Sequence, residues 1–156
     1  MSREESTRKA IHRLLRGQQL GVLSTAGAEG PYASLVAFAI SDDDRRLFFV
    51  TPRTTRKFAN ISTDTRVALL VNNSLNRPED FHQAAAVTAL GRAATIQPPE
   101  LDGVRDRYLA KHPHLEEFAY SPSCAFVAIR VERYVLVERF QNVTEFRIEN
   151  ELDCPH

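Results

Sequence analysis

A basic turn that follows a short apolar strand is the part of the sequence best suited to bind an anion. The strand covers residues 47–51, and Thr54 and Thr55 then stand where a helix N-cap is expected. Three cations lie within five residues of the sequence here: Arg53, Arg56 and Lys57. A helix N-terminus presents unpaired N–H groups and the positive end of the helix dipole. A phosphate bound at this turn would therefore meet amides, hydroxyls and cations together.

The same residues also fit a simpler interpretation, a strand and a turn followed by a solvated basic helix start, because basic clusters are common on protein surfaces. One physical argument weighs against it. Cations in the first turn of a helix oppose the helix dipole by about 0.3–1 kcal/mol each. An anion, from the chain or from a ligand, is therefore expected to compensate them.

A polar loop with the sequence NNSLNRPEDF covers residues 72–81. Its Asn, Arg and Asp side chains match the composition of an ordinary surface loop, but loops also carry many binding residues. From composition alone, the loop is either a solvated turn or a set of side chains that face a ligand.

The segment His112–Glu117 contains two histidines and two glutamates, which are potential metal ligands. Pro113 separates the histidines and prevents helical i, i+4 spacing, and the sequence has no HExxH or CxxC pattern. We therefore expect no metal site here and interpret the segment as a loop before a helix.

Length and charge restrict the class of protein. The 156 residues suit a single domain, residues 1–156, and 20 basic residues balance 20 acidic ones. No overall field attracts nucleic acid or an anionic membrane, so we expect neither as a partner. Two cysteines, Cys124 and Cys154, and an N-terminus without an apolar signal region predict a cytoplasmic protein. The apolar run Leu35–Ile40 is far shorter than the roughly 20 residues of a membrane-spanning helix.

Apolar periodicity predicts a mainly β chain with small α-helices. The expected strands are Leu20–Ser24, Tyr32–Ile40, Arg46–Thr51, Arg66–Val71, Ala84–Ile96, Cys124–Val131, Tyr134–Phe140 and Thr144–Ile148. The expected helices are one from Ser2 to Gly17, Thr54–Ile61, one from Pro98 to Lys111, and a helical piece in His112–Tyr120. Gly91 inside a strand indicates a bulge or a close backbone approach. Short antiparallel strands with small connecting helices favour a closed or split β-barrel over a parallel sheet.

In order and type, these residues resemble the pyridoxamine 5'-phosphate oxidase-related family of FMN-binding split barrels, over about residues 10–140. The most specific match is LFFVTPRTTRK, which aligns without a gap on the family pattern FYTN..SRK. The resemblance implies that Thr55, Arg56 and Lys57 hold the FMN phosphate, and that Val50 and Thr51 lie against the flavin. It also places Ser34, Val36 and Ala37 on the strand whose backbone and side chains line the flavin ring. Contacts at Ser34 are expected through the backbone, because Ser34 replaces a charged residue of the family.

The resemblance further implies that the loop after residue 71 approaches the cofactor. It assigns Asn73 and Ser74 to the ring or ribityl chain, and Arg77 and His82 to a substrate. Ala86 replaces a flavin-contacting Gln of the true oxidase, and the closing sequence FRIENELDCPH lacks the oxidase motif R.HDR. Oxidation of pyridoxamine phosphate is therefore not expected.

The function implied by the resemblance is that of a cytoplasmic, homodimeric FMN protein, an oxidoreductase acting on a small-molecule substrate or electron donor. The cofactor itself would carry the redox chemistry, so no catalytic side chain is assigned. We expect a two-fold dimer with an interface above roughly 2,000 Å². Two other classes remain open: a non-catalytic flavin- or haem-binding or storage module, and a deazaflavin-dependent reductase on the same fold.

Overall fold

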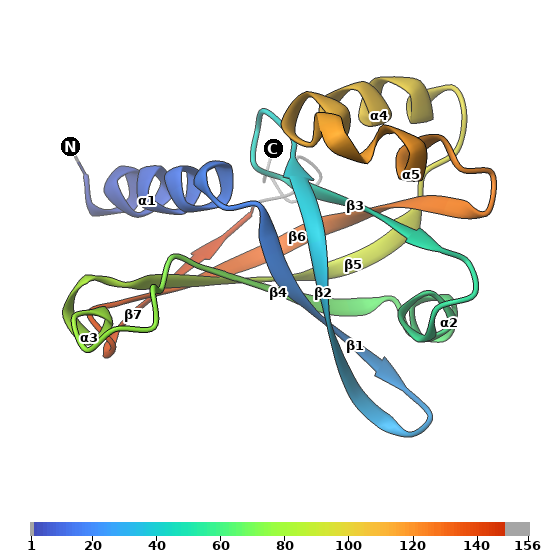
Figure 1. The fold of residues 1–156 in the computed structure, drawn as a ribbon. Coiled ribbons are helices and arrows are strands. Elements are labelled where there is room, and N and C mark those ends of the chain that lie inside the picture. The colour runs from blue at the N-terminus through green and yellow to red at the C-terminus, as the bar shows by residue number, and fades with distance from the viewer. Residues whose placement is uncertain (1, 149–156) are drawn as a thin grey trace, which may run out of the picture.

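The computed structural model describes residues 2–148 and contains seven strands and five α-helices in that range (Figure 1). The strands are β1 (Leu20–Gly27), β2 (Gly30–Ile40), β3 (Arg46–Pro52), β4 (Arg66–Asn72), β5 (Ala85–Thr95), β6 (Cys124–Glu138) and β7 (Asn142–Arg147). The helices are α1 (Arg3–Gly17), α2 (Arg56–Thr63), α3 (Asp80–Gln83), α4 (Glu100–Lys111) and α5 (Glu116–Tyr120). Cys154 and most of the closing segment FRIENELDCPH lie outside the described residues.

The strands form one antiparallel sheet in the order β3-β2-β1-β4-β5-β6-β7, and β3 also pairs with β6. The additional pairing closes β1 to β6 into a barrel and leaves β7 outside the ring. In the closed ring, the backbone N–H and C=O groups of β3 and β6 pair with each other, whereas the edge strands of an open sheet leave such groups free. The prediction of a mainly β chain, built as a split antiparallel barrel with small helices, is confirmed.

A long hairpin formed by β1 and β2 projects from the barrel. β2 pairs with β3 only through Phe38, Ala39 and Ile40, so its earlier residues pair with β1 alone. Figure 1 shows this hairpin extending past α2, beyond the rest of the sheet. The hairpin turn therefore lies close to the first residues of α2.

Two apolar clusters hold the fold together. The interior of the barrel is filled by side chains such as Phe38 and Phe49, and α1 adds Leu15 while α2 adds Ile61. A second cluster lies outside the barrel, where α4 and α5 cover the neighbouring faces of β3 and β6 (Figure 1). Successive side chains of β3 therefore point alternately into the barrel and towards α4.

The structure corrects the prediction of two strands, Cys124–Val131 and Tyr134–Phe140, because β6 runs without a break through both. The polar pair Glu132 and Arg133 lies between them and is exposed, so it interrupts the apolar pattern; Glu132 has no partner on β5, but β6 continues through it and pairs again from Arg133. β6 ends at Glu138, earlier than expected, because Arg139 and Phe140 both adopt positive φ angles, of 50° and 67°.

Gly91 marks a bulge, as its position in the sequence predicts. The pairing of β5 with β6 shifts register between Leu90 and Gly91, which face Arg133 and Val131 respectively. A Cβ atom at position 91 would lie 2.1 Å from the carbonyl oxygen of Arg130. Only glycine allows the two backbones to approach this closely.

The helices differ from the prediction at their ends. α2 begins at Arg56 instead of Thr54, because Thr55 is its N-cap and not its first residue. The predicted polar loop contains the short helix α3, and no helix in the range 2–148 is long and apolar enough to cross a membrane.

Candidate functional site

The turn between β3 and α2 is held by two threonine hydroxyls. Thr55 caps α2, since its Oγ1 accepts a hydrogen bond of 3.3 Å from the N–H of Phe58. The hydroxyls of Thr51 and Thr55 lie 2.8 Å apart, and both lie close to the carbonyl oxygen of Pro52. Thr51 is fully buried. The predicted N-cap is confirmed, and the turn is rigid on its inner side.

The first residues of α2 offer donors without protein partners. Among the described residues, the N–H groups of Arg56 and Lys57 have no hydrogen-bond acceptor, as is usual in the first turn of a helix. Both groups lie at the positive end of the helix dipole. This helix start can therefore present amides and a cationic side chain to an anion.

The three cations of the turn have different surroundings. Nη1 of Arg53 donates to the carbonyl oxygens of Pro122 and Cys124, at 2.8 and 2.9 Å, so Arg53 fixes the chain before β6. Arg56 instead pairs with Glu29 of the β1–β2 turn, at 2.6 Å. The carboxylate of Glu29 raises the pKa of Arg56. Lys57 is partly exposed and forms no ion pair among the described residues.

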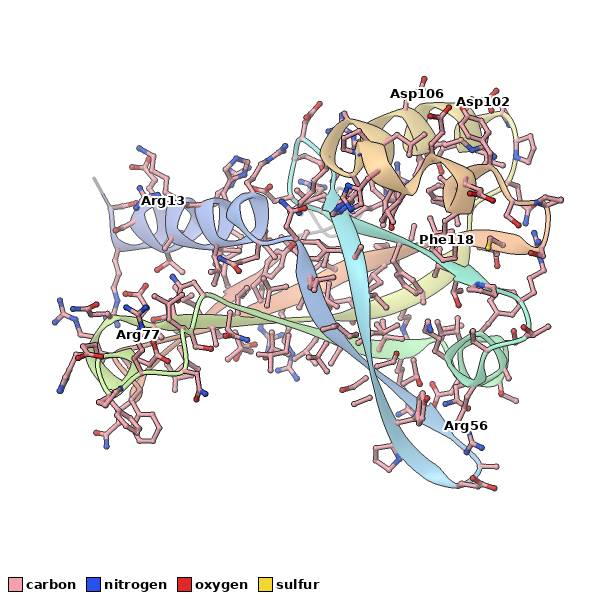
Figure 2. All side chains as sticks on the ribbon, in the orientation of Figure 1. Arg13, Arg56, Arg77, Asp102, Asp106 and Phe118 are labelled. Carbon is pink, nitrogen blue, oxygen red and sulfur yellow. The ribbon has the colours of Figure 1, made fainter. Side chains whose placement is uncertain are left out.

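A hollow lies between the β1–β2 turn and the start of α2. Its volume is about 660 Å³, within the roughly 300–1,000 Å³ of small-molecule sites. Its lining residues are Gly27, Ala28, Glu29, Gly30, Pro31, Tyr32, Thr54, Thr55, Arg56, Ala59 and Asn60. Figure 2 shows Arg56 beside the projecting hairpin. The hollow, the free amides of α2 and Arg56 together form what we call the phosphate corner.

The end of the hairpin nearest its turn lies against α2. Asn60 donates from its Nδ2 to the hydroxyl of Thr25, at 3.0 Å. A Cβ atom at Gly27 would lie 2.3 Å from Oδ1 of the same asparagine. The glycine therefore leaves room for the side chain of Asn60 against β1.

The expected flavin-lining residues do not share one surface. Successive residues of a strand point to opposite faces, and Val36 is buried in the barrel interior while Val50 is buried in the cluster beneath α4. Ala37 packs at the edge of that second cluster. The side chains of Val36 and Val50 therefore pack in the two apolar clusters. Only the backbone atoms of these residues remain for contact with a ligand.

Ser34 is an exception among the strand residues. Its Oγ atom is buried and has no hydrogen-bond partner among the described residues. A buried hydroxyl without a partner is rare in native proteins and calls for an explanation. Ser34 pairs with Leu23 on β1, two residues further along the strand than the pair of Tyr32 with Thr25 at the phosphate corner.

The loop after β4 is organised by its own hydrogen bonds. Asn73 exchanges two bonds with Ala85, of 3.2 and 2.8 Å. Asp80 accepts from the backbone N–H groups of Leu75 and Arg77, each at 3.1 Å, and these bonds lower the pKa of the Asp80 carboxyl.

The remaining residues expected to contact a ligand from this loop are exposed. Ser74 donates from its backbone to the side chain of Asn72, at 3.0 Å. Ser74, Arg77 and His82 all face solvent. Among the described residues, neither Arg77 nor His82 forms an ion pair.

Loop and phosphate corner lie at opposite ends of the molecule, where Figure 2 labels Arg77 and Arg56. β4 starts near the end of α2 and runs for seven residues before the loop, about 20 Å at roughly 3.3 Å per residue. Within one chain, the structure therefore brings Thr51, Thr55, Arg56 and Lys57 together but does not bring Asn73, Ser74, Arg77 and His82 to them.

Sequence reasoning did not identify Glu29, Tyr32 and Asn60 as parts of the corner. The guanidinium of Arg56 lies 5.6 Å from the ring centre of Tyr32. Glu29 and Tyr32 reach α2 through the length of the hairpin, and Asn60 lies on α2 itself; no local spacing in the sequence signals the contact between them.

Sequence reasoning also missed the role of His112. This side chain is only 1% exposed, and its Nε2 lies 2.8 Å from the carbonyl oxygen of Phe38. It joins the end of α4 to β2. Within residues 2–148, no group of three or more His, Cys, Asp or Glu side chains is placed to hold a metal ion.

A split barrel with a basic turn between its third strand and a short helix defines a structural class, and the sequence places the chain within that class. The family described as pyridoxamine 5'-phosphate oxidase matches residues 7–138. The chain belongs to this family. A search of curated proteins by sequence found no match.

Solved structures share the fold. A heme-binding protein from Mycobacterium smegmatis has a TM-score of 0.76 and 19% identity, covering 86% of this chain and 55% of its own. An FAD-binding protein from Mesorhizobium loti has a TM-score of 0.65 and 17% identity, with 87% and 94% coverage. HutZ, the heme storage protein of Vibrio cholerae, has a TM-score of 0.68 and 15% identity, with 80% and 89% coverage.

At these identities the likeness establishes the fold alone. The chain spans about half the length of the Mycobacterium smegmatis protein. Relatives on this fold thus include proteins described as binding FAD and proteins described as binding or storing heme.

Proposed function

We propose that the chain binds FMN, holds its phosphate at the phosphate corner, and acts as a flavin-dependent oxidoreductase on a small molecule. One observation carries the proposal: the unpaired amide and the guanidinium of Arg56 meet at a hollow of ligand size, and the unpaired amide of Lys57 follows in the same helix start. Membership of the family supports it, as does the FAD-binding relative on the same fold.

The residues of the corner fit a phosphate monoester. The amides of α2 would donate to its oxygens, and the charge of Arg56 would neutralise it through short, charge-assisted hydrogen bonds. Lys57 does not line the hollow, so we assign its ammonium a longer-range attraction to the phosphate and no direct contact. Flavin supplies the electron transfer when bound, and the chain supplies anchoring and orientation.

Ser34 fits a role towards the same ligand. Its unpartnered hydroxyl lies on the strand that leads from the corner, two residues beyond Tyr32. A polar ring atom that bonded to this hydroxyl would satisfy it. We assign Ser34, and the backbone of Val36, Ala37, Val50 and Thr51, to orientation of the ring.

A second copy of the chain would bring the loop after β4 to the corner. The surface proposed to meet the second copy is a largely apolar row of side chains across the outside of the sheet. Directly paired residues of neighbouring strands share a face and so form this row. The row comprises Leu35, Val22, Leu70, Thr88 and Val135.

Leu35 and Leu70 in this row are 63% and 38% exposed. A two-fold axis in this face, perpendicular to the strands, places the corner of one copy beside the loop of the other. We therefore propose a homodimer in which Asn73, Ser74, Arg77 and His82 complete the site in trans.

Flavin fits the corner better than haem does. Haem proteins hold the iron mainly through His, Cys or Met, and less often through Tyr. The residues lining the hollow, all within the described range, include no His, Cys or Met, and Tyr32 is engaged by Arg56. The donor set at the corner instead matches a phosphate.

The absorbance spectrum of the purified protein tests the proposal. We expect flavin bands in the protein as isolated, or after incubation with FMN and removal of the free cofactor. A deazaflavin cofactor added in parallel separates the two flavin classes. Uptake of haem with a Soret band, together with no uptake of FMN, would contradict the proposal.

A further inference from the structure

An acidic side chain occupies the position from which a phosphate would approach Arg56. Glu29 lies in the turn between β1 and β2, and its Oε2 is 2.6 Å from Nη1 of Arg56. Glu29 also lines the hollow. The chain therefore supplies its own anion to the cation at the start of α2, which the helix dipole would otherwise destabilise.

This ion pair is easily exchanged. The side chain of Glu29 is 80% exposed and that of Arg56 is 54% exposed, so solvent weakens their attraction. Gly27 lies against Asn60 and Gly30 turns the chain at φ 108°, so the carboxylate of Glu29 reaches Arg56 from the turn through its side chain. A rotation of the Glu29 side chain alone is sufficient to free the guanidinium.

Arg56 keeps a second contact when Glu29 moves away. Its guanidinium lies 5.6 Å from the centre of the Tyr32 ring, within the range of a cation–π interaction. The ring thus holds the guanidinium over the hollow while its anion is exchanged.

We propose that Glu29 is a specificity-determining residue, an internal anion that a ligand must displace from Arg56. The inference rests on the proposed binding of a phosphate at this corner. A doubly charged phosphate monoester displaces the carboxylate because it carries more charge and also bonds the amides of α2. A ligand without a phosphate leaves the Glu29–Arg56 pair intact and gains nothing from Arg56.

Titration of Glu29→Gln with FMN at low ionic strength tests this role. Exposed ion pairs are weak, so we expect the affinity for FMN to rise by about two- to five-fold, and the affinity for riboflavin to stay unchanged. The gain should shrink at high salt, where exposed charges are screened. In an Arg56→Ala background, Glu29→Gln should have no effect.

Glu132→Gln is the matched control, because Glu132 forms a similar exposed ion pair with Arg92, at 3.2 Å, away from the corner. It should leave the affinity for FMN unchanged. Weaker binding by Glu29→Gln would show that Glu29 positions Arg56 for the ligand, and would overturn the inference. Unchanged binding at low salt would overturn it as well.

Calorimetric titration with inorganic pyrophosphate separates this inference from the proposed function. If the wild-type protein takes up no FMN, the cofactor assignment fails, but the comparison with pyrophosphate still decides the role of Glu29. Tighter binding of pyrophosphate by Glu29→Gln than by the wild type supports the inference. Equal or weaker binding overturns it.

Discussion

Arg56 shows how a local pattern and a distant contact combine at one residue. Its position after a capping threonine follows from three neighbouring residues of the sequence and was predictable. The need for a compensating anion was predictable as well, from the helix dipole. That Glu29 provides it was not, because 27 positions separate the two residues and only the paired hairpin brings them together.

Arg56→Ala should weaken FMN binding by about 10- to 100-fold, since a hydrogen bond to a charged group contributes roughly 1.5–3 kcal/mol. Lys57→Ala should have a smaller effect, because Lys57 does not line the hollow and its ammonium attracts the phosphate only at longer range. Quenching of flavin fluorescence measures both affinities. The control is Arg66→Ala, an exposed arginine that pairs with Asp64 at 2.7 Å beyond the end of α2. Equal affinities in the Arg56 and Arg66 variants would argue against the corner.

Among the elements, strands were easier to predict than their ends. Apolar runs identified the positions of all the strands, and Gly91 identified the bulge. The division of β6 was wrong because a polar pair on the outside of a barrel looks, in sequence, like a turn. Placement of the loop after β4 relative to α2 could not be predicted, since it depends on the direction in which β4 crosses the barrel.

The end of α4 is joined to α1 and β2 by a lysine and a histidine that sequence patterns did not reveal. Nζ of Lys111 donates to the carbonyl oxygen of Leu15, at 3.2 Å, and lies 3.9 Å from the ring centre of Phe38. His112 bonds the carbonyl oxygen of the same Phe38. These contacts fix α4 over the second apolar cluster.

The stability of this junction should depend on pH. Burial, and to a lesser degree the charge of Arg16, lowers the pKa of Lys111 from 10.5 to about 8. Between these values the unfolded chain keeps a proton that the folded chain has released, so this group makes the free energy of unfolding rise with pH. Lys111→Met should lose that rise.

Urea unfolding at several pH values between about 8 and 9 measures the effect, below the range in which tyrosines of the unfolded chain, with a pKa near 10, ionise. Lys9→Met is the control, because Lys9 is exposed on α1. It should keep the pH dependence of the wild type. A rise with pH that persists unchanged in Lys111→Met would show that another group causes it.

At the scale of the whole molecule, the apolar row on the outer sheet face is the strongest sign of a partner. Leu70 is 38% exposed although its neighbours Leu69 and Val71 are fully buried, so the strand presents an apolar side chain on each face. Such a strand fits a sheet that is covered on both sides. A second copy of the chain would cover the outer face and join the two halves of the proposed site.

Sedimentation at low micromolar concentration should show a dimer for the wild type. The double variant Leu35→Lys, Leu70→Lys should be monomeric and should bind FMN more weakly, because charges would be buried at the interface. Tyr120→Lys is the control, a 54% exposed residue beside α4 and away from this face. A wild-type monomer that binds FMN tightly would rule out a site shared between two copies.

The most direct test of the phosphate corner compares FMN with riboflavin, which has the same ring and ribityl chain but no phosphate. Titration of the wild-type protein with each ligand isolates the part of the affinity that the phosphate provides. Contacts to Arg56 and to the amides of α2 predict that FMN binds at least about 100-fold more tightly than riboflavin. Equal affinity for the two ligands would contradict the assignment of this corner to a phosphate.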